Sequence, residues 1–253
     1  MPSPRRLIAG NWKMNGLRTD AVARAGALRD KAAASRVALP DIVVCPPFTL
    51  LTTVGQAVGS MLALGAQDCH AADKGAHTGD VAAPMLAELG CRYVIVGHSE
   101  RRAGHGETDK QVRAKAEAAH RAGLVAIICV GESANERKAG RHLAVVAAQL
   151  DFSLPSGAGA ANTVIAYEPV WAIGTGLTPM PADVAEMHGH LRKRLSDALP
   201  KDDEGEGIRL LYGGSANAGN AAELLATPGV DGLLVGGASL DAEAFWKMVQ
   251  AAC

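Results

Sequence analysis

The stretch VIAYEPVWAIGTGLTPMPADVAEMHGHLRKRLSDAL, residues 164–199, contains the pattern that decides the fold. It begins with an apolar run over residues 164–167, and short runs without polar alternation are typical of strands that are buried on both faces. Farther along, apolar residues recur at steps of three and four, at Val184, Met187, Leu191 and Leu195. That spacing predicts an amphipathic helix. The stretch is therefore a strand followed by a helix, the unit from which parallel sheets are built.

The same pattern recurs along the whole chain. Apolar runs rich in β-branched residues predict strands at residues 7–10, 42–45, 62–66, 93–96, 125–130, 164–167, 209–212 and 232–235. Helical spacing is found at residues 19–35, 108–122, 141–150, 181–199 and 241–252. With no linker-like break between the units, we expect a (β/α)8 barrel that occupies residues 1–253 as a single domain. A doubly wound open sheet is the alternative, but no GxGxxG turn follows the first strand.

Composition excludes several classes of partner. Hydrophobic residues make up 48% of the 253 residues and charged residues 20%, as in a soluble globular protein with a sizeable core. The net charge of −1 gives no electrostatic reason to expect nucleic acid as a partner. No apolar run approaches the roughly 18 residues of a membrane span. The five cysteines lie far apart without a CxxC pair, which suits reduced thiols. We therefore expect a cytoplasmic enzyme.

Polar side chains follow three of the predicted strands, at the end where a barrel carries its active site. The period of two along a strand places these residues on the faces that would fill the barrel: Ala9 with Asn11 and Lys13, Val94 and Val96 with His98, and Val164 and Ala166 with Glu168. We therefore expect Asn11, Lys13, His98 and Glu168 to converge at the top of the barrel.

Each of these residues also has a structural interpretation. Lys13 alone fits a surface charge, His98 a buried core histidine, and Glu168 an ion pair with an arginine. Glu100, two residues after His98, is expected to be an ion-pair partner of Lys13 or of a nearby arginine. The joint placement of the polar residues at three strand ends favours a catalytic site.

Two glycine-rich turns follow the seventh and eighth predicted strands, in LLYGGSAN (210–217) and LLVGGASL (233–240). Glycines leave backbone N–H groups unobstructed, and a helix start adds a positive dipole, so each turn suits a phosphoryl group. Helix packing alone also explains a glycine pair. Two pairs at the positions where barrels commonly bind phosphate indicate a phosphorylated ligand.

A carboxylate, an imidazole and an ammonium group without a metal are typical of proton transfer next to a carbonyl. Glu168 would remove the proton, and His98, Lys13 and Asn11 would stabilise the charge that develops on the carbonyl oxygen. The helix expected to begin at Ser99 disfavours imidazolium, so His98 would act as a neutral donor. Pro169 to Gly176 reads as a lid that excludes water, in which the N–H of Gly174 reaches the phosphate.

The motifs NWKMN, YVIVGHSERR, CVGE, AYEPVWAIGTG, YGGS and DGLLVGGASL, in this order, closely resemble those of the triosephosphate isomerase family. The resemblance implies a TIM barrel that interconverts dihydroxyacetone phosphate and glyceraldehyde 3-phosphate in glycolysis and gluconeogenesis, usually as a homodimer, with no cofactor and no metal. It also implies residue roles: Glu168 as base, His98 as electrophile, Asn11 and Lys13 as substrate contacts, Gly174, Ser215, Gly236 and Gly237 as phosphate contacts, and Glu100, Ser99 and Cys129 as supporting residues.

The family further implies a loop after the third strand that inserts into a partner subunit. Here it is DKGAHTGDVAAPML (73–86), in which Thr78 and Gly79 match the family pattern. The chain departs from that pattern at His77, where an aromatic ring is common, at Ala82, where a serine caps the next helix, and at Leu177, where the lid often carries lysine. These departures bear on dimer strength and lid kinetics but leave the reaction intact, although Asp80 would have to replace the missing cap.

Three other functions compete with isomerisation. Glu100 and Glu168 would be the carboxylate pair of a glycosidase, but only 4% of the residues are aromatic and the phosphate turns would be unused. Lys13 would be the nucleophile of a Schiff-base aldolase. The chain would also fit a phosphate-binding interaction protein that has lost catalysis, but the intact set of polar strand-end residues argues against this.

Overall fold

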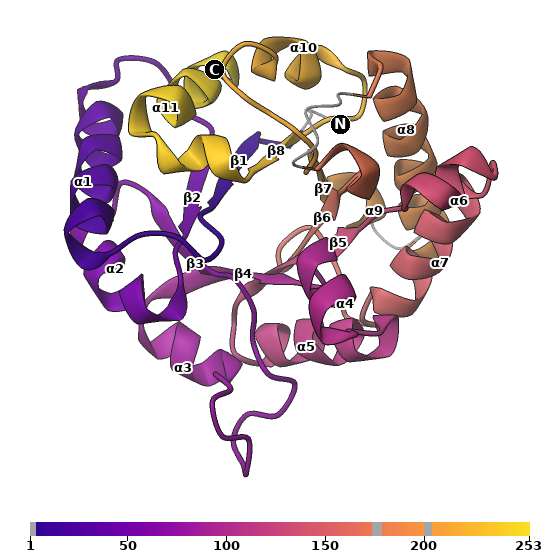
Figure 1. Ribbon diagram of the computed structural model, residues 1–253, viewed down its shortest axis with the longest axis horizontal. Helices are drawn as coiled ribbons and strands as arrows, with labels where there is room; N and C mark the ends of the chain where they lie inside the picture. Colours follow the sequence, from indigo (N-terminus) through magenta and orange to yellow (C-terminus); the bar gives the residue numbers. More distant parts are fainter. Residues whose placement is uncertain (1–3, 174–178, 200–203) are drawn as a thin grey trace.

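The computed structural model of the chain describes residues 4–173, 179–199 and 204–253. Parallel strands hydrogen-bond in sequence order and close into a barrel, which helices surround (Figure 1). Closure is made by β1 and β8, where Leu7 lies opposite Gly232, while on its other side Leu7 lies opposite Asp41. The strands are β1 (Leu7–Asn11), β2 (Asp41–Cys45), β3 (Ala63–Ala66), β4 (Cys91–Val96), β5 (Val125–Val130), β6 (Thr163–Tyr167), β7 (Arg209–Tyr212) and β8 (Gly232–Val235). The predicted fold is confirmed.

The helices cover the outside of the barrel. They are α1 (Arg18–Ala34), α2 (Leu51–Val58), α3 (Ala83–Glu88), α4 (Ser99–His105), α5 (Asp109–Arg121), α6 (Ala134–Lys138), α7 (His142–Ser153), α8 (Pro181–Ala198), α9 (Glu204–Gly207), α10 (Ala221–Ala226) and α11 (Ala242–Ala251), with short 3-10 helices η1 (Phe48–Leu50), η2 (Val170–Ala172) and η4 (Gly237–Leu240). Among the described helices, none combines the length and the hydropathy that a membrane span requires.

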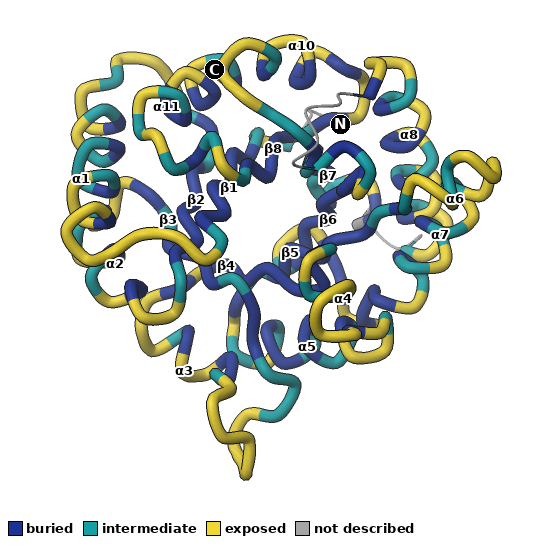
Figure 2. The backbone as a smooth tube through the Cα atoms, viewed as in Figure 1, coloured by how far each residue is buried: buried dark blue, intermediate teal, exposed yellow. Residues whose placement is uncertain are grey.

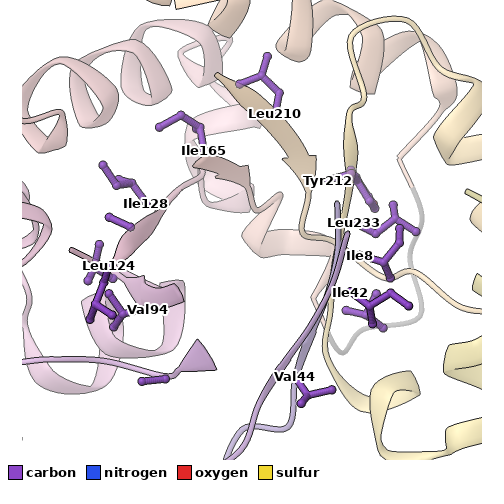
Figure 3. Close-up of a cluster of buried hydrophobic side chains, with 14 of the residues drawn as sticks. Ile8, Ile42, Val44, Val94, Leu124, Ile128, Ile165, Leu210, Tyr212 and Leu233 are labelled. Atoms are coloured by element: carbon purple, nitrogen blue, oxygen red, sulfur yellow. The ribbon is translucent and has the colours of Figure 1, made fainter. Parts of the chain in front are cut away.

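The core has two layers, as the alternation of side chains along each strand requires. The strands and the inner faces of the helices are buried (Figure 2). One layer lies between strands and helices, and Figure 3 shows part of it, including Ile8, Ile42, Ile128, Ile165 and Leu233. The other layer is made of the inward side chains of the strands, among them Ala9, Ile95, Ile127, Val164, Ala166 and Leu211.

The face predicted for β4 is wrong. Val94 and Val96 belong to the layer between strands and helices, whereas Ile95 belongs to the interior of the barrel. Gly97 lies at φ 67°, a left-handed conformation that interrupts the alternation of the strand. His98 therefore turns to the mouth of the barrel from a strand whose alternation would have pointed it outward.

The loop between β3 and α3 projects away from the barrel (Figure 1). Residues 73–80, including Thr78 and Gly79, are exposed, and the rings of His70 and His77 stack with centroids 3.9 Å apart. No side chain caps α3 at Ala82, so Asp80 does not replace the missing serine cap. Pro84 in the first turn of α3 removes one of the N–H groups that a cap would satisfy.

Candidate active site

The predicted polar residues of three strand ends lie in one pocket. A cavity of about 310 Å³ at the C-terminal end of the barrel is lined by Asn11, Lys13, His98 and Glu168. Residues of the two glycine-rich turns form the rest of its wall, among them Gly213, Ser215, Gly236 and Gly237. The expected convergence is therefore present, and three separate strands produce it.

His98 and Glu168 are hydrogen-bonded to each other. Nε2 of His98 lies 2.9 Å from Oε1 of Glu168. Both residues are buried: His98 is 6% exposed and Glu168 is 1% exposed. The backbone N–H of Ser99 donates to Oε2 of Glu168 over 2.9 Å, and the Ser99 hydroxyl lies 3.3 Å from Oε1. Ser99 thus holds the carboxylate beside the imidazole, as its place at the start of α4 allows.

The protonation state of His98 follows from two contacts. Burial lowers the pKa of His98, but the Glu168 carboxylate outweighs it and the net pKa is raised. However, Nδ1 of His98 accepts a hydrogen bond from the Glu100 backbone N–H at 3.2 Å, which a protonated ring could not do. A neutral ring with its proton on Nε2 satisfies both contacts. A ligand that displaces Glu168 from Nε2 would remove the main cause of the raised pKa.

Glu168 is a carboxylate in spite of its burial. Burial raises the pKa of Glu168, but His98, the Ser99 N–H and the Cys129 thiol together lower it below the ordinary value. Burial raises the pKa of Cys129 well above that of a free thiol, so Cys129 stays protonated and donates to Glu168. The site thus holds an ionised base with little contact with water.

Lys13 is held in an unusual backbone conformation. Among the described residues it is the one non-glycine with a positive φ, 52°. Its N–H donates to Oδ1 of Asn11 at 3.0 Å, and its carbonyl accepts from Nε2 of Gln67 at 2.8 Å. Its ammonium lies 2.6 Å from Oε1 of Glu100, so the ion pair expected for Glu100 is confirmed. Gln67 was not predicted, because its role depends on a contact across 54 positions.

The glycine turns approach the reacting groups closely. A β-carbon on Gly236 would lie 3.3 Å from Cε of Lys13, and one on Gly213 would lie 3.0 Å from Cγ of Glu168. Sequence reasoning missed Gly213, although it belongs to the glycine pair that was expected to bind phosphate. The hydroxyl of Ser215 donates to the carbonyl of Ala172. This bond connects the turn after β7 to the segment that follows Glu168.

The segment after β6 is described as far as Ile173, and Gly174, Gly176 and Leu177 lie outside the described residues. Its beginning is anchored by Glu132, whose Oε1 accepts from Trp171 Nε1 at 2.8 Å and from Tyr167 Oη at 3.1 Å. The motif CVGE contains Glu132, but the sequence assigned it no role. Its role as an anchor is visible only from its contacts in the structure.

A second group of polar side chains lies on the projecting loop. Possible ligand atoms of His70, His77 and Asp80 lie within 4.8 Å of one another. Nδ1 of His70 accepts from the Ala72 N–H at 3.0 Å, so in the neutral ring Nε2 carries the proton and has no lone pair for a metal.

Comparison with known proteins agrees with this geometry. The family described as triosephosphate isomerase matches residues 6–252. Curated triosephosphate isomerases from Afipia carboxidovorans and Rhodopseudomonas palustris are 56% and 58% identical, over 98% and 95% of this chain and 97% and 95% of theirs. A crystal structure of triosephosphate isomerase from Bartonella henselae, 46% identical, superposes with a TM-score of 0.90 over 98% of each chain. The chain therefore belongs to the triosephosphate isomerase family.

Proposed function

We propose that this chain interconverts dihydroxyacetone phosphate and glyceraldehyde 3-phosphate through an enediolate, without a cofactor. The observation that carries the proposal is the meeting of Glu168 and His98 in a pocket whose remaining wall is formed by Lys13, Asn11 and two glycine turns. An ionised base, a neutral donor, a cation and unobstructed backbone N–H groups are the groups that this reaction needs.

Glu168 takes the proton from the carbon next to the carbonyl. The C–H electron pair forms the carbon–carbon double bond, and the carbonyl π pair moves to its oxygen. Nε2–H of His98 and the ammonium of Lys13 donate to that oxygen, and such preorganised donors are typically worth about 3 to 4 kcal/mol each. Glu168 then returns the proton to the neighbouring carbon, while a proton is exchanged between the two oxygens. No atoms are gained or lost.

The phosphate of the substrate is assigned to the turns after β7 and β8. Gly236 immediately precedes the short helix η4, which begins at Gly237, and Ser215 follows the glycine pair after β7. Lys13 extends over Gly236, so its charge lies between the phosphate turn and the reacting carbons. Gly174 is proposed as a further phosphate contact from the lid.

The lid protects the intermediate. An enediolate next to a phosphate eliminates it when water and free rotation are admitted, so closure must exclude both. The hydrogen bond from Trp171 to Glu132 and the bond from Ser215 to Ala172 hold the lead-in to the lid at two points beside Glu168.

We also propose that the chain acts in the cytoplasm as a homodimer. The projecting loop exposes Thr78 and Gly79, and two apolar side chains are open to solvent: Met14, next to Lys13, is 94% exposed and Met85, on α3 after the loop, is 50% exposed. Burying such side chains against a partner is favourable. Sedimentation at micromolar concentration tests the assembly.

An enzyme-coupled assay tests the reaction in both directions. With purified chain, glyceraldehyde 3-phosphate should yield dihydroxyacetone phosphate, and the reverse, and in a separate incubation with a ketose phosphate and borohydride the chain should gain no covalent adduct. Covalent trapping by borohydride would indicate an aldolase that uses Lys13. Absence of turnover with both trioses would refute the proposed function.

The structure argues against the glycosidase alternative. Glu100 is exposed and paired with Lys13, which leaves a glycosidase without its general acid.

A further inference from the structure

Arg24 on α1 touches two separate parts of the candidate active site. Its Nε donates to the carbonyl of Leu240 at 2.6 Å. Its guanidinium carbon lies 4.6 Å from the ring centroid of Trp12, within the range of a cation–π contact. Leu240 ends the short helix η4 after β8, and Trp12 lies between Asn11 and Lys13 after β1.

The contact at Trp12 bears on the strained residue next to it. Lys13 has a φ of 52°, which costs energy for a residue with a β-carbon unless its surroundings hold it. Trp12 is fully buried, with its backbone N–H donating to the Cys45 carbonyl at 3.1 Å. Arg24 lies over the face of the Trp12 ring. It therefore restrains the residue that directly precedes Lys13.

The contact at Leu240 bears on the turn assigned to the phosphate. Ser239 joins this turn to β1 from inside, because its hydroxyl donates to the Gly236 carbonyl at 2.7 Å and lies 3.4 Å from the Asn11 carbonyl. Arg24 provides a second connection, from outside. The two turns also meet directly, since Lys13 lies over Gly236.

The environment of Arg24 favours a fixed side chain. Burial lowers its pKa, an effect that Asp20 and Asp241 partly offset, and the group remains a guanidinium. Its position is half-buried between α1 and the two turns. A planar group that donates from Nε while stacking on an aromatic ring is a task that lysine cannot perform equally well.

We propose that Arg24 is a positioning residue for phosphate binding: it connects the turn of Trp12 and Lys13 to the turn of residues 236–240, so that the ammonium of Lys13 and the N–H groups of the glycine turn are aligned before the substrate arrives. The assignment rests on the proposed function, because it assumes that the turn receives the substrate phosphate.

The test compares Arg24→Met with Arg29→Met. Arg29 lies on the same helix and donates to the Ala57 carbonyl at 3.1 Å, which connects α1 to α2 and not to the site. For glyceraldehyde 3-phosphate, R24M should lower kcat/KM about tenfold, mainly through KM, because misaligned donors lose binding energy. Phosphate-free glyceraldehyde still uses Lys13 at its carbonyl oxygen but makes no contact with the glycine turn, so its kcat/KM should fall by clearly less than that of the phosphorylated substrate. R29M should change neither.

A second measurement does not depend on turnover. Calorimetric titration with inorganic phosphate should show weaker binding by R24M, by about the same tenfold factor, and intermediate binding by Arg24→Lys, which keeps the charge but loses the planar donor. If R24M fails to fold, R24K carries the same comparison with a smaller effect. Unchanged phosphate affinity, or equal losses for the substrates with and without phosphate, would overturn the inference. An inactive wild type whose phosphate affinity nevertheless falls in R24M would refute only the proposed function.

Discussion

The main chain of Glu168 lies against Gly131 so closely that a β-carbon on Gly131 would fall 1.7 Å from the Glu168 carbonyl oxygen. The two segments are also connected by a hydrogen bond from the Glu168 N–H to the Val130 carbonyl, 2.8 Å long. The end of β5 thus supports the base from behind. Any side chain at position 131 must push the end of β6 outward.

Gly131→Ala should therefore impair the enzyme at its base. Because the backbone of Glu168 must move by an ångström or more, we expect kcat to fall by about 10² or more. Steady-state assays on the purified variant measure this. Gly189→Ala is the control, because a β-carbon there meets nothing within 4 Å beyond its own helix backbone and the residue lies inside α8, where alanine is preferred. Equal activities of the two variants would contradict the close approach.

Glu168→Asp tests the position of the base without removing its charge. The shorter side chain withdraws the carboxylate by about 1 Å, and we expect kcat to fall by roughly 10² or more with little change in KM. A pre-steady-state measurement of proton abstraction would show the loss in the chemical step. Turnover near that of the wild type would mean that another group is the base.

The buried His188 should make the free energy of unfolding depend on pH. Burial lowers its pKa from 6.5 to about 4, although its Nδ1 hydrogen-bonds the Gly229 carbonyl at 2.9 Å. Since the folded pKa is below the unfolded one, the contribution is complete above pH 6.5 and is lost as the pH falls toward 4, by about 3 kcal/mol in total. Urea unfolding at pH 7 and pH 4.5 measures the slope.

His188→Asn separates this effect from other acid-sensitive groups. Asparagine keeps a donor for Gly229 but does not titrate. Its unfolding free energy should be lower than that of the wild type at pH 7, and it should fall less between pH 7 and pH 4.5. Identical slopes in the two proteins would show that His188 is not the group responsible.

Lys115 joins two buried carboxylates below the projecting loop. Its ammonium lies 2.8 Å from Asp68 and 2.5 Å from Glu107, and Arg101 contacts both acids. Lys115→Met leaves two acids with one cation, so we expect a loss of about 3 kcal/mol in unfolding free energy. Lys193→Met removes an exposed pair with Asp197 and should cost less than about 0.5 kcal/mol. Equal losses in urea unfolding would show that burial does not matter here.

The sequence predicted the barrel because strand runs and long amphipathic helices have a visible period. It placed Asn11 and Glu168 correctly, since both continue the alternation of a strand. It mistook the face of β4 because Gly97 turns the chain before His98. It overlooked α2, α6, α9 and α10, each too short to show a helical period, and α3 was expected only from the family resemblance.

Other residues escaped prediction because their roles depend on distant partners. Arg24 and Leu240 are 216 positions apart, and Glu132 and Trp171 are 39 apart. A period in the sequence reports which face of an element is apolar and says nothing of which polar group meets which. The resemblance to the family indicated the reacting residues. The contacts by which Arg24 connects Trp12 to Leu240 are visible only in the structure.

The measurement that tests the central claim most directly follows the proton in D₂O. Glyceraldehyde 3-phosphate is converted by the wild-type chain and by Glu168→Gln, and the product is examined by proton NMR. We predict that a fraction of the dihydroxyacetone phosphate carries solvent deuterium on the carbon that receives the proton, because the proton held by Glu168 exchanges with solvent in some turnovers before it is returned, and that E168Q is slower by about 10³ or more. An E168Q variant as fast as the wild type, with the same deuterium content in its product, would contradict proton transfer by Glu168.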